Sequence, residues 1–192
     1  MYIAIEGIDT AGKSTQINAL RNHFPDALIT KEPGGTVIGK EIRKLVLSAK
    51  TKSKRAEFLL FLADRAEHVK EIIEPNLQKM IISDRSAVSG VAYALTQGDI
   101  SKDELVLLND FATKKIYPQK IFLLRLTKEE LEYRLSQKEL DGIELRGSEY
   151  LLQIQDSIKQ ASQLLGLTLV EIDATKSINE ITQEILKEID ND

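Results

Sequence analysis

The sequence predicts an α/β fold, a three-layer sandwich in which a five-stranded parallel sheet is flanked by helices. Three observations predict it. Short apolar runs recur at wide spacing, helical patterns lie between them, and the first apolar run leads directly into a glycine-rich loop. Alternation of strand and helix favours a parallel sheet with right-handed crossovers. Ligands are then expected at the carboxyl ends of the strands.

The apolar runs are of strand length and are expected to be buried on both faces of the sheet. They lie at residues 2–6, 27–30, 80–84, 120–126 and 167–173. Helical patterns cover residues 13–24, 37–48, 54–79, 102–116, 128–137, 148–166 and 177–189. A segment at about 137–148, with two glycines and mixed charge, fits either a mobile lid or an ordinary surface loop.

Length and composition bound the class of protein. The 192 residues are 42% hydrophobic and 29% charged, which favours a single domain over residues 1–192 with a substantial core. The net charge of −4 argues against a nucleic-acid partner, and the absence of cysteine excludes disulfides and thiolate sites. No signal peptide or membrane-length apolar run is present. We therefore expect a cytoplasmic protein that binds neither nucleic acid nor membrane.

The glycine-rich loop reads GIDTAGKST and fits the G-x-x-x-x-G-K-[ST] pattern of phosphate-binding loops. Its glycines let backbone N–H groups approach phosphates, Lys13 supplies a positive charge, and Ser14 offers a hydroxyl to Mg²⁺. The following helix adds a favourable dipole for an anion. A turn kept for packing alone is the alternative, which the strand before and the helix after disfavour. The predicted nucleoside triphosphate site comprises Gly7, Ile8, Asp9, Thr10, Ala11, Gly12, Lys13, Ser14 and Thr15.

Two further segments combine stiff or aromatic residues with arginine. KEPGGT, residues 31–36, is a turn or a close approach to a ligand, and Arg43 follows it on a helix. In FLLFLADRAEHV, Phe61 and Arg65 are four residues apart and share one helical face. They form either a base-reading pair or part of the core.

The segment IISDRS places an acid and an arginine directly after a buried run. Asp84 there is a candidate Mg²⁺-side carboxylate and Arg85 a phosphate clamp, although a structural ion pair between them is the alternative. His23 and His68 lie in helical patterns without a partner at ligand spacing, so we interpret both as structural. The predicted metal ligands are Ser14 and Asp84.

Together these motifs resemble those of thymidylate kinases, a family of P-loop nucleoside monophosphate kinases. The resemblance runs in order from about residue 2 to residue 185 through GIDTAGKST, EPGGT with IGKEIR, LFLADRAEHV, DRSAVSGVAY, YPQKIFLL and EIDATKSINEI. It implies a P-loop kinase fold and transfer of the γ-phosphate of ATP to dTMP, giving dTDP and ADP in dTTP biosynthesis. It also implies Mg²⁺ as cofactor and a homodimer.

The resemblance implies a role for each matching residue. Asp9 would contact the 3′-hydroxyl of dTMP, Arg43 and Arg85 its 5′-phosphate, and Phe61 and Arg65 its base. The implied substrate-binding set is Asp9, Glu32, Pro33, Arg43, Phe61, Arg65, Arg85, Ser89 and Tyr93. The implied catalytic set is Asp9, Lys13, Arg85 and Arg146, and the implied adenine-side set is Arg134, Asp173, Ala174 and Thr175.

The chain departs from the family pattern in its cations. Thr10 stands where some members carry a catalytic arginine, and Arg125 stands where relatives commonly have an aspartate. Arg146, Arg134 and Lys138 lie in or beside the lid, and the pattern leaves open which cation reaches the transferred phosphoryl group.

Another nucleoside monophosphate or deoxynucleoside kinase is the alternative enzyme. A regulatory ATP-binding module is the alternative outside enzymes, while the N-K-x-D motif of a GTPase is absent.

Overall fold

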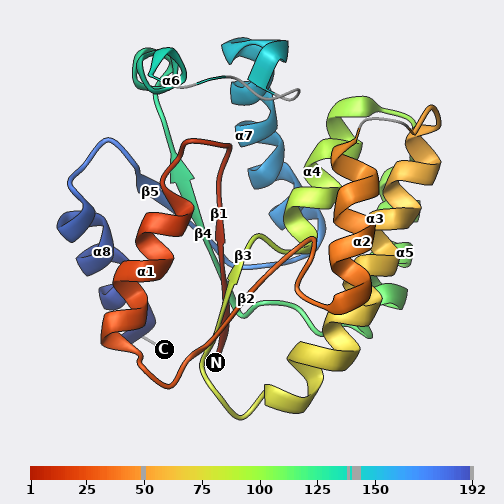
Figure 1. The fold of residues 1–192 in the computed structure, drawn as a ribbon, viewed down its shortest axis with the longest axis horizontal. Coiled ribbons are helices and arrows are strands. Elements are labelled where there is room, and N and C mark those ends of the chain that lie inside the picture. Colours follow the sequence, from red (N-terminus) through yellow and green to blue (C-terminus); the bar gives the residue numbers. More distant parts are fainter. Residues whose placement is uncertain (49–50, 138, 140–143, 191–192) are drawn as a thin grey trace.

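The sheet is five-stranded and parallel, with strand order β2-β3-β1-β4-β5. The structure, a computed structural model, describes residues 1–48, 51–137, 139 and 144–190 (Figure 1). The strands are β1 (Tyr2–Glu6), β2 (Leu28–Lys31), β3 (Ile81–Asp84), β4 (Lys120–Arg125) and β5 (Leu169–Asp173). Each predicted strand is confirmed, with bounds that agree within two residues.

Helices cover both faces of this sheet. In Figure 1, α1 and α8 lie together on one face, while α4 and α7 lie on the other with α3 and α5 beside α4. The helices are α1 (Lys13–His23), α2 (Val37–Leu47), α3 (Lys54–His68), α4 (Ala87–Gln97), α5 (Lys102–Thr113), α6 (Lys128–Ser136), α7 (Ser148–Leu164) and α8 (Ile178–Asp190). The predicted three-layer architecture is confirmed.

Three details differ from the sequence-based expectation. The sequence patterns do not predict α4, because it is buried on nearly all sides and therefore shows no apolar stripe. The single helix expected over 54–79 ends at His68 and continues as a π-helix (Val69–Ile73) and a 3₁₀ turn (Glu74–Asn76), which contains the helix breaker Pro75. The edge strands β2 and β5 are only partly buried, because each has a neighbour on one side alone.

The core lies between the central strands and the helices on both faces. All of β1 and the first five residues of β4 are buried. Arg125, at the end of β4, donates to Glu171 on β5 at 2.7 Å and to Asp156 on α7 at 2.9 Å. This residue therefore ties two strands and a helix together at the edge of the core. None of the helices within the described ranges is long and apolar enough to cross a bilayer.

The parallel register brings the loops after the strands to one edge of the sheet. Ile5 on β1 and Lys31 on β2 both lie opposite Asp84 on β3. The chain segments that follow these three strands carry the predicted phosphate loop, the EPGGT turn and the DRS motif. Motifs that lie about 25 to 50 residues apart in sequence thus meet at the carboxyl ends of the strands, as predicted.

Candidate active site

The loop between β1 and α1 has the backbone shape that its glycines predict. Gly7 has φ of +152°, and a Cβ there would lie 3.0 Å from the carbonyl oxygen of Leu124. Gly12 caps α1 with φ of +93° and without a side-chain hydrogen bond to the first turn. The first N–H groups of α1 are therefore not satisfied by a capping side chain, which is the arrangement that binds anions.

Lys13 is folded back onto this loop. Its Nζ donates to the carbonyl oxygens of Gly7 and Ile8, both at 3.0 Å, and lies 3.8 Å from the Asp9 carboxylate. Burial, reinforced by the nearby Arg85 guanidinium and opposed by Asp9, lowers the pKa of Lys13 to about 8. Lys13 is thus a buried cation whose charge depends on the anions around it.

A cavity of about 620 Å³ opens over the phosphate loop, and it is called the donor pocket below, after the phosphate donor that the sequence predicts for this loop. Two polar atoms near it, Asp84 Oδ1 and Thr10 Oγ1, are buried without a hydrogen-bond partner among the described residues. An unpartnered carboxylate oxygen in the same cavity as Ser14 fits a hard divalent cation, which prefers oxygen ligands. The lining residues are Asp9, Thr10, Gly12, Lys13, Ser14, Thr15, Lys31, Glu32, Arg43, Asp84 and Arg85.

Arg134 holds two loops together beside the donor pocket. Its Nη1 donates to the carbonyl oxygen of Thr10 at 2.9 Å, and its Nη2 donates to that of Ala174 at 2.8 Å. Ala174 belongs to the predicted DAT loop, in which Asp173 accepts hydrogen bonds from the N–H and hydroxyl of Thr175. The structure thus places this loop next to the phosphate loop. Both amino groups of the Arg134 guanidinium are therefore bonded to backbone oxygens.

Arg85 lies at the centre of the site. It has φ of +69°, in the left-handed region, and its N–H donates to the Ile5 carbonyl oxygen. Its Nη2 donates to Asp9 at 2.8 Å and its Nη1 to the Ser89 hydroxyl at 3.1 Å. Burial opposes the charge, but Tyr93 and the carboxylates of Asp9, Glu6 and Asp84 raise the pKa of Arg85 above its ordinary value.

Glu6, which no sequence motif singles out, supports the Arg85 side of the site. Its carboxylate accepts hydrogen bonds from the N–H and hydroxyl of Ser86 and from the Ser89 hydroxyl. Burial raises the pKa of Glu6, although Arg85 and these serines counteract it. An acid at the end of an apolar strand is the only sequence signal for this position. Glu6 therefore supports Arg85 through Ser89.

A second cavity of about 190 Å³ adjoins the first, and it is called the acceptor pocket below, after the phosphate acceptor that the sequence predicts for its lining residues. All nine predicted substrate-binding residues line it: Asp9, Glu32, Pro33, Arg43, Phe61, Arg65, Arg85, Ser89 and Tyr93. Among the described residues, Asp9, Glu32, Arg43 and Arg85 line both pockets. Arg43 also donates to the Pro33 carbonyl oxygen at 3.0 Å. The two cavities thus share a wall that carries two arginines.

Glu32 and Arg65 form a buried pair beneath the acceptor pocket. Glu32 Oε2 accepts from Arg65 Nε, and Glu32 Oε1 accepts from His68 Nδ1, both at 2.9 Å. Although burial acts in the opposite direction, Arg65 and His68 lower the pKa of Glu32. Both carboxylate oxygens of this predicted substrate-binding residue are therefore engaged by protein groups.

Arg146 lines neither pocket. It is exposed, donates to the Tyr150 hydroxyl at 2.9 Å and has its guanidinium carbon 5.1 Å from the centre of the Tyr150 ring. Its catalytic role stays a prediction. Residues 138 and 140–143 of the predicted lid, including Lys138, lie outside the described residues.

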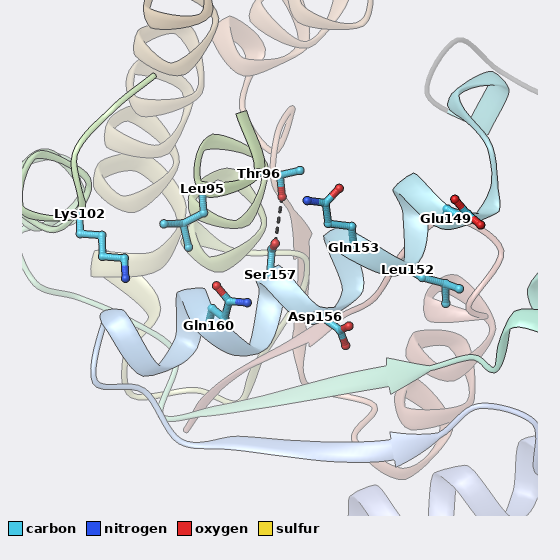
Figure 2. Close-up of a pocket in the computed structure, with 9 residues that line it drawn as sticks. All are labelled: Leu95, Thr96, Lys102, Glu149, Leu152, Gln153, Asp156, Ser157 and Gln160. Carbon is cyan, nitrogen blue, oxygen red and sulfur yellow. Dashed lines mark hydrogen bonds between the residues drawn. The ribbon is translucent and has the colours of Figure 1, made fainter. Parts of the chain in front are cut away.

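A third hollow of about 620 Å³ lies over α4, the start of α5 and α7. Figure 2 shows Thr96 on α4 hydrogen-bonded to Ser157 on α7, with the Gln153 and Gln160 amides on either side. No predicted site residue lines this hollow. The motifs therefore converge on the donor and acceptor pockets and not here.

Comparisons with known proteins find matches over almost the whole chain. A family model described as thymidylate kinase matches residues 5–185. A thymidylate kinase of Sulfurimonas denitrificans is 74% identical over 189 residues, covering 98% of this chain and 99% of the relative. One of Sulfurovum sp. is 54% identical, covering 97% of each. The crystal structure of thymidylate kinase from Ehrlichia chaffeensis superposes with a TM-score of 0.75 at 27% identity, covering 99% of this chain and 98% of that one.

Proposed function

The chain belongs to the thymidylate kinase family, and we propose that its donor and acceptor pockets hold the two nucleotides of that reaction. The enzyme transfers the γ-phosphate of ATP to dTMP, giving dTDP and ADP in nucleotide biosynthesis. The single observation that carries the assignment of the pockets is their shared wall, which contains Asp9, Arg43 and Arg85. A shared wall lets the two phosphates approach each other in line.

The proposed mechanism relies on positioning and charge. Phosphoryl transfer needs little covalent help from a protein, because the acceptor phosphate oxygen is itself the nucleophile. Lys13 and the first N–H groups of α1 bind the donor phosphates, while Arg43 and Arg85 bind the acceptor phosphate. Asp9, held by Arg85 at 2.8 Å, orients that arginine and accepts from the sugar hydroxyl. Arg134 and the loop Asp173–Thr175 border the adenine side.

Mg²⁺ fits the donor pocket through Ser14 and Asp84. The unpartnered, buried Oδ1 of Asp84 supports this assignment, since a buried carboxylate oxygen without a partner is costly. Bound there, Mg²⁺ would neutralise charge on the donor phosphates, with its remaining ligands from phosphates and water. No group of three or more acidic or histidine side chains that could hold a metal alone occurs in the described part of the chain.

The first experiment compares acceptors. Purified protein with ATP and Mg²⁺ should release ADP fastest with dTMP, when dTMP, dUMP, dCMP, dGMP and the ribonucleoside monophosphates are offered at equal concentration. EDTA should reduce the rate with dTMP to background. Preference for another monophosphate would assign a different kinase, and background hydrolysis with every acceptor would leave only an ATP-binding module.

We also propose that the enzyme is a homodimer formed through the outer face of α3 and α5. These helices pack side by side, and both expose large apolar residues. Phe111 is 84% exposed and Leu107 68%, one turn apart on α5, and Leu59 on α3 is 57% exposed. Ala63 and Ala66 continue the face on α3 and are small enough to allow close helix packing. A second copy would cover this face in a symmetric interface.

Phe111→Glu should therefore shift the enzyme to monomer. A central aromatic residue of an interface contributes about 2 kcal/mol or more, so the dimer dissociation constant should rise at least about 30-fold. Sedimentation over a range of concentrations measures it. Tyr133→Glu, which changes a 62% exposed aromatic residue on α6, is the matched control. A dimer unchanged by Phe111→Glu would exclude this face.

A location in the cytoplasm is likewise an expectation, which cell fractionation checks.

A further inference from the structure

The Arg65 guanidinium is buried, and only some of its donors are bonded. Its Nε donates to Glu32 at 2.9 Å, its Nη1 to Asn109 Oδ1 at 2.9 Å and its Nη2 weakly to the Ser86 carbonyl oxygen at 3.5 Å. An arginine has five N–H donors, so two have no hydrogen bond within the described residues. Arg65 is 2% exposed and lines the acceptor pocket. Buried donors without partners favour a ligand that can accept from them.

Asn109 holds Arg65 from α5 without lining the pocket. It is fully buried on the inner face of that helix, between Leu105 and Ala112. Its amide nitrogen donates to the Leu105 carbonyl oxygen at 2.7 Å, which leaves Oδ1 as the atom facing Arg65. A polar side chain at this position of an apolar face is costly unless bonded. Both polar atoms of the Asn109 side chain are bonded, and its Oδ1 fixes the orientation of the Arg65 guanidinium.

His68 holds Arg65 indirectly, through Glu32. His68 is fully buried, with Nδ1 on Glu32 at 2.9 Å and Nε2 on the Thr30 hydroxyl at 2.6 Å. A carboxylate only accepts, so Nδ1 is the donor in the first contact. With Oε1 held by His68, the carboxylate cannot rotate away from Arg65 Nε. The position of Glu32 therefore depends on His68.

Gly90 makes room for the guanidinium inside α4. A Cβ at this position would lie 3.0 Å from Arg65 Nη2, which is closer than ordinary contacts. Arg65 cannot easily retreat, because Glu32 and Asn109 hold its other nitrogens. Glycine is disfavoured within helices relative to alanine. Its occurrence at position 90 fits a need for space beside Nη2.

We propose that Asn109, His68 and Gly90 are positioning residues that aim the two unbonded N–H groups of Arg65 at the acceptor base. The inference rests on the proposed acceptor pocket, in which Phe61 lies on the same face of α3 as Arg65. Because a fixed guanidinium donates and never accepts, the favoured base edge carries a carbonyl oxygen, as in thymine and uracil. Cytosine presents an amino donor at the corresponding position and is disfavoured.

The test compares Asn109→Leu with Asn109→Asp in steady-state kinetics. Asn109→Leu removes the acceptor for Nη1 and should raise KM for dTMP about tenfold or more and lower the preference for dTMP over dCMP. The KM for ATP and kcat should stay within about threefold, since the donor pocket is untouched. Asn109→Asp keeps an oxygen facing Arg65 and should recover most of the dTMP affinity. Thr113→Val, equally buried on α5 and not bonded to Arg65, is the matched control.

His68 and Gly90 are tested by their own variants. His68→Asn keeps a donor near the Nδ1 position and should retain more dTMP affinity than His68→Leu. Gly90→Ala keeps all polar partners of Arg65 and favours the helix, so it also serves as the test if Asn109→Leu fails to fold. It should raise KM for dTMP about tenfold, while KM for ATP stays within about threefold.

Two outcomes would overturn the inference. One is that Asn109→Leu or Gly90→Ala leaves dTMP affinity and the preference over dCMP within twofold of the parent. The other is a parallel loss of dTMP affinity, ATP affinity and stability in Asn109→Leu with unchanged kinetics in Gly90→Ala, which indicates a structural role. A parent enzyme without preference for dTMP would instead contradict the proposed acceptor, whatever the variants do.

Discussion

Lys13→Met is expected to lower kcat by about 10³-fold, because it removes the cation of the phosphate loop in a buried site. Lys13 Nζ is held by the carbonyl oxygens of Gly7 and Ile8 and is 3.8 Å from Asp9. Thr10 brings no charge to this loop, which increases the dependence on Lys13. Methionine keeps an unbranched, apolar stem of similar length. Steady-state measurement of kcat with saturating ATP and dTMP checks the prediction.

Lys44→Met provides the control, because Lys44 is exposed on α2 and pairs only with Glu41 among the described residues. Its kcat should equal that of the parent. A Lys13→Met variant within tenfold of the parent would contradict the role of Lys13.

Arg146→Ala in the same assay tests the lid arginine. A fall of about tenfold or more in kcat supports a catalytic role of Arg146, and an unchanged kcat excludes that role.

The pH dependence offers a second readout for Lys13. Since burial lowers the pKa of Lys13 to about 8, the free chain loses this charge as pH rises above that value. Donor phosphates favour the charged form, so ATP affinity should fall above about pH 8 and binding there should take up a proton. Calorimetric titration in two buffers of different ionisation enthalpy measures the uptake. Lys13→Met should abolish it.

The same pKa shift affects folding in a defined direction. The unfolded chain keeps the Lys13 proton up to about pH 10.5, whereas the folded chain releases it near pH 8. Between these values the unfolded state binds more protons, so the contribution of Lys13 to the free energy of unfolding increases, which is stabilising, as pH rises. At neutral pH the buried positive charge of Lys13 therefore lowers the free energy of unfolding.

Arg85→Met is expected to lower kcat/KM for dTMP by about 10³-fold, while KM for ATP changes within about threefold. The variant removes a fork of donors from the acceptor phosphate. It also leaves the Asp9 carboxylate without its 2.8 Å partner, so a negative group then faces the dianionic substrate. Titration of dTMP at saturating ATP measures the effect.

Arg85→Lys should lie between the parent and Arg85→Met, since an ammonium keeps the charge but cannot reach Asp9 and Ser89 in one planar fork. Arg21→Met, an exposed change on α1, is the control and should be neutral. If Arg85→Met raised KM for ATP as much as KM for dTMP, Arg85 would belong to the donor and not to the acceptor.

The fold was predictable where local patterns carry the information. Continuous apolar runs locate the central strands because these strands are buried on both faces, and the phosphate loop locates the edge of the sheet at which the predicted motifs meet. The helix α4 was not predictable in this way. This helix is buried on nearly all sides, so its sequence shows no alternation of an apolar and a polar face. Ser89 and Gly90, for example, are buried although neither is a large apolar residue.

The candidate site divides along similar lines. The residues that line the acceptor pocket follow recognisable motifs, whereas their supports do not. Asn109 contacts Arg65 across 44 residues, and Glu6 contacts Ser89 across 83, so no local spacing relates them. Arg125 likewise looks anomalous in sequence. Its role becomes visible only when β5 and α7 bring Glu171 and Asp156 to it.

The two carbonyl contacts of Lys13 have a consequence for product release. In the proposed donor site, a lysine already bonded to Gly7 and Ile8 would exchange these bonds for bonds to a phosphate, so only the difference would contribute to affinity. On departure of ADP, the ammonium would return to the same two oxygens and would not be left unsatisfied. Bound ADP would therefore be released at a lower cost than from a lysine with no other partner.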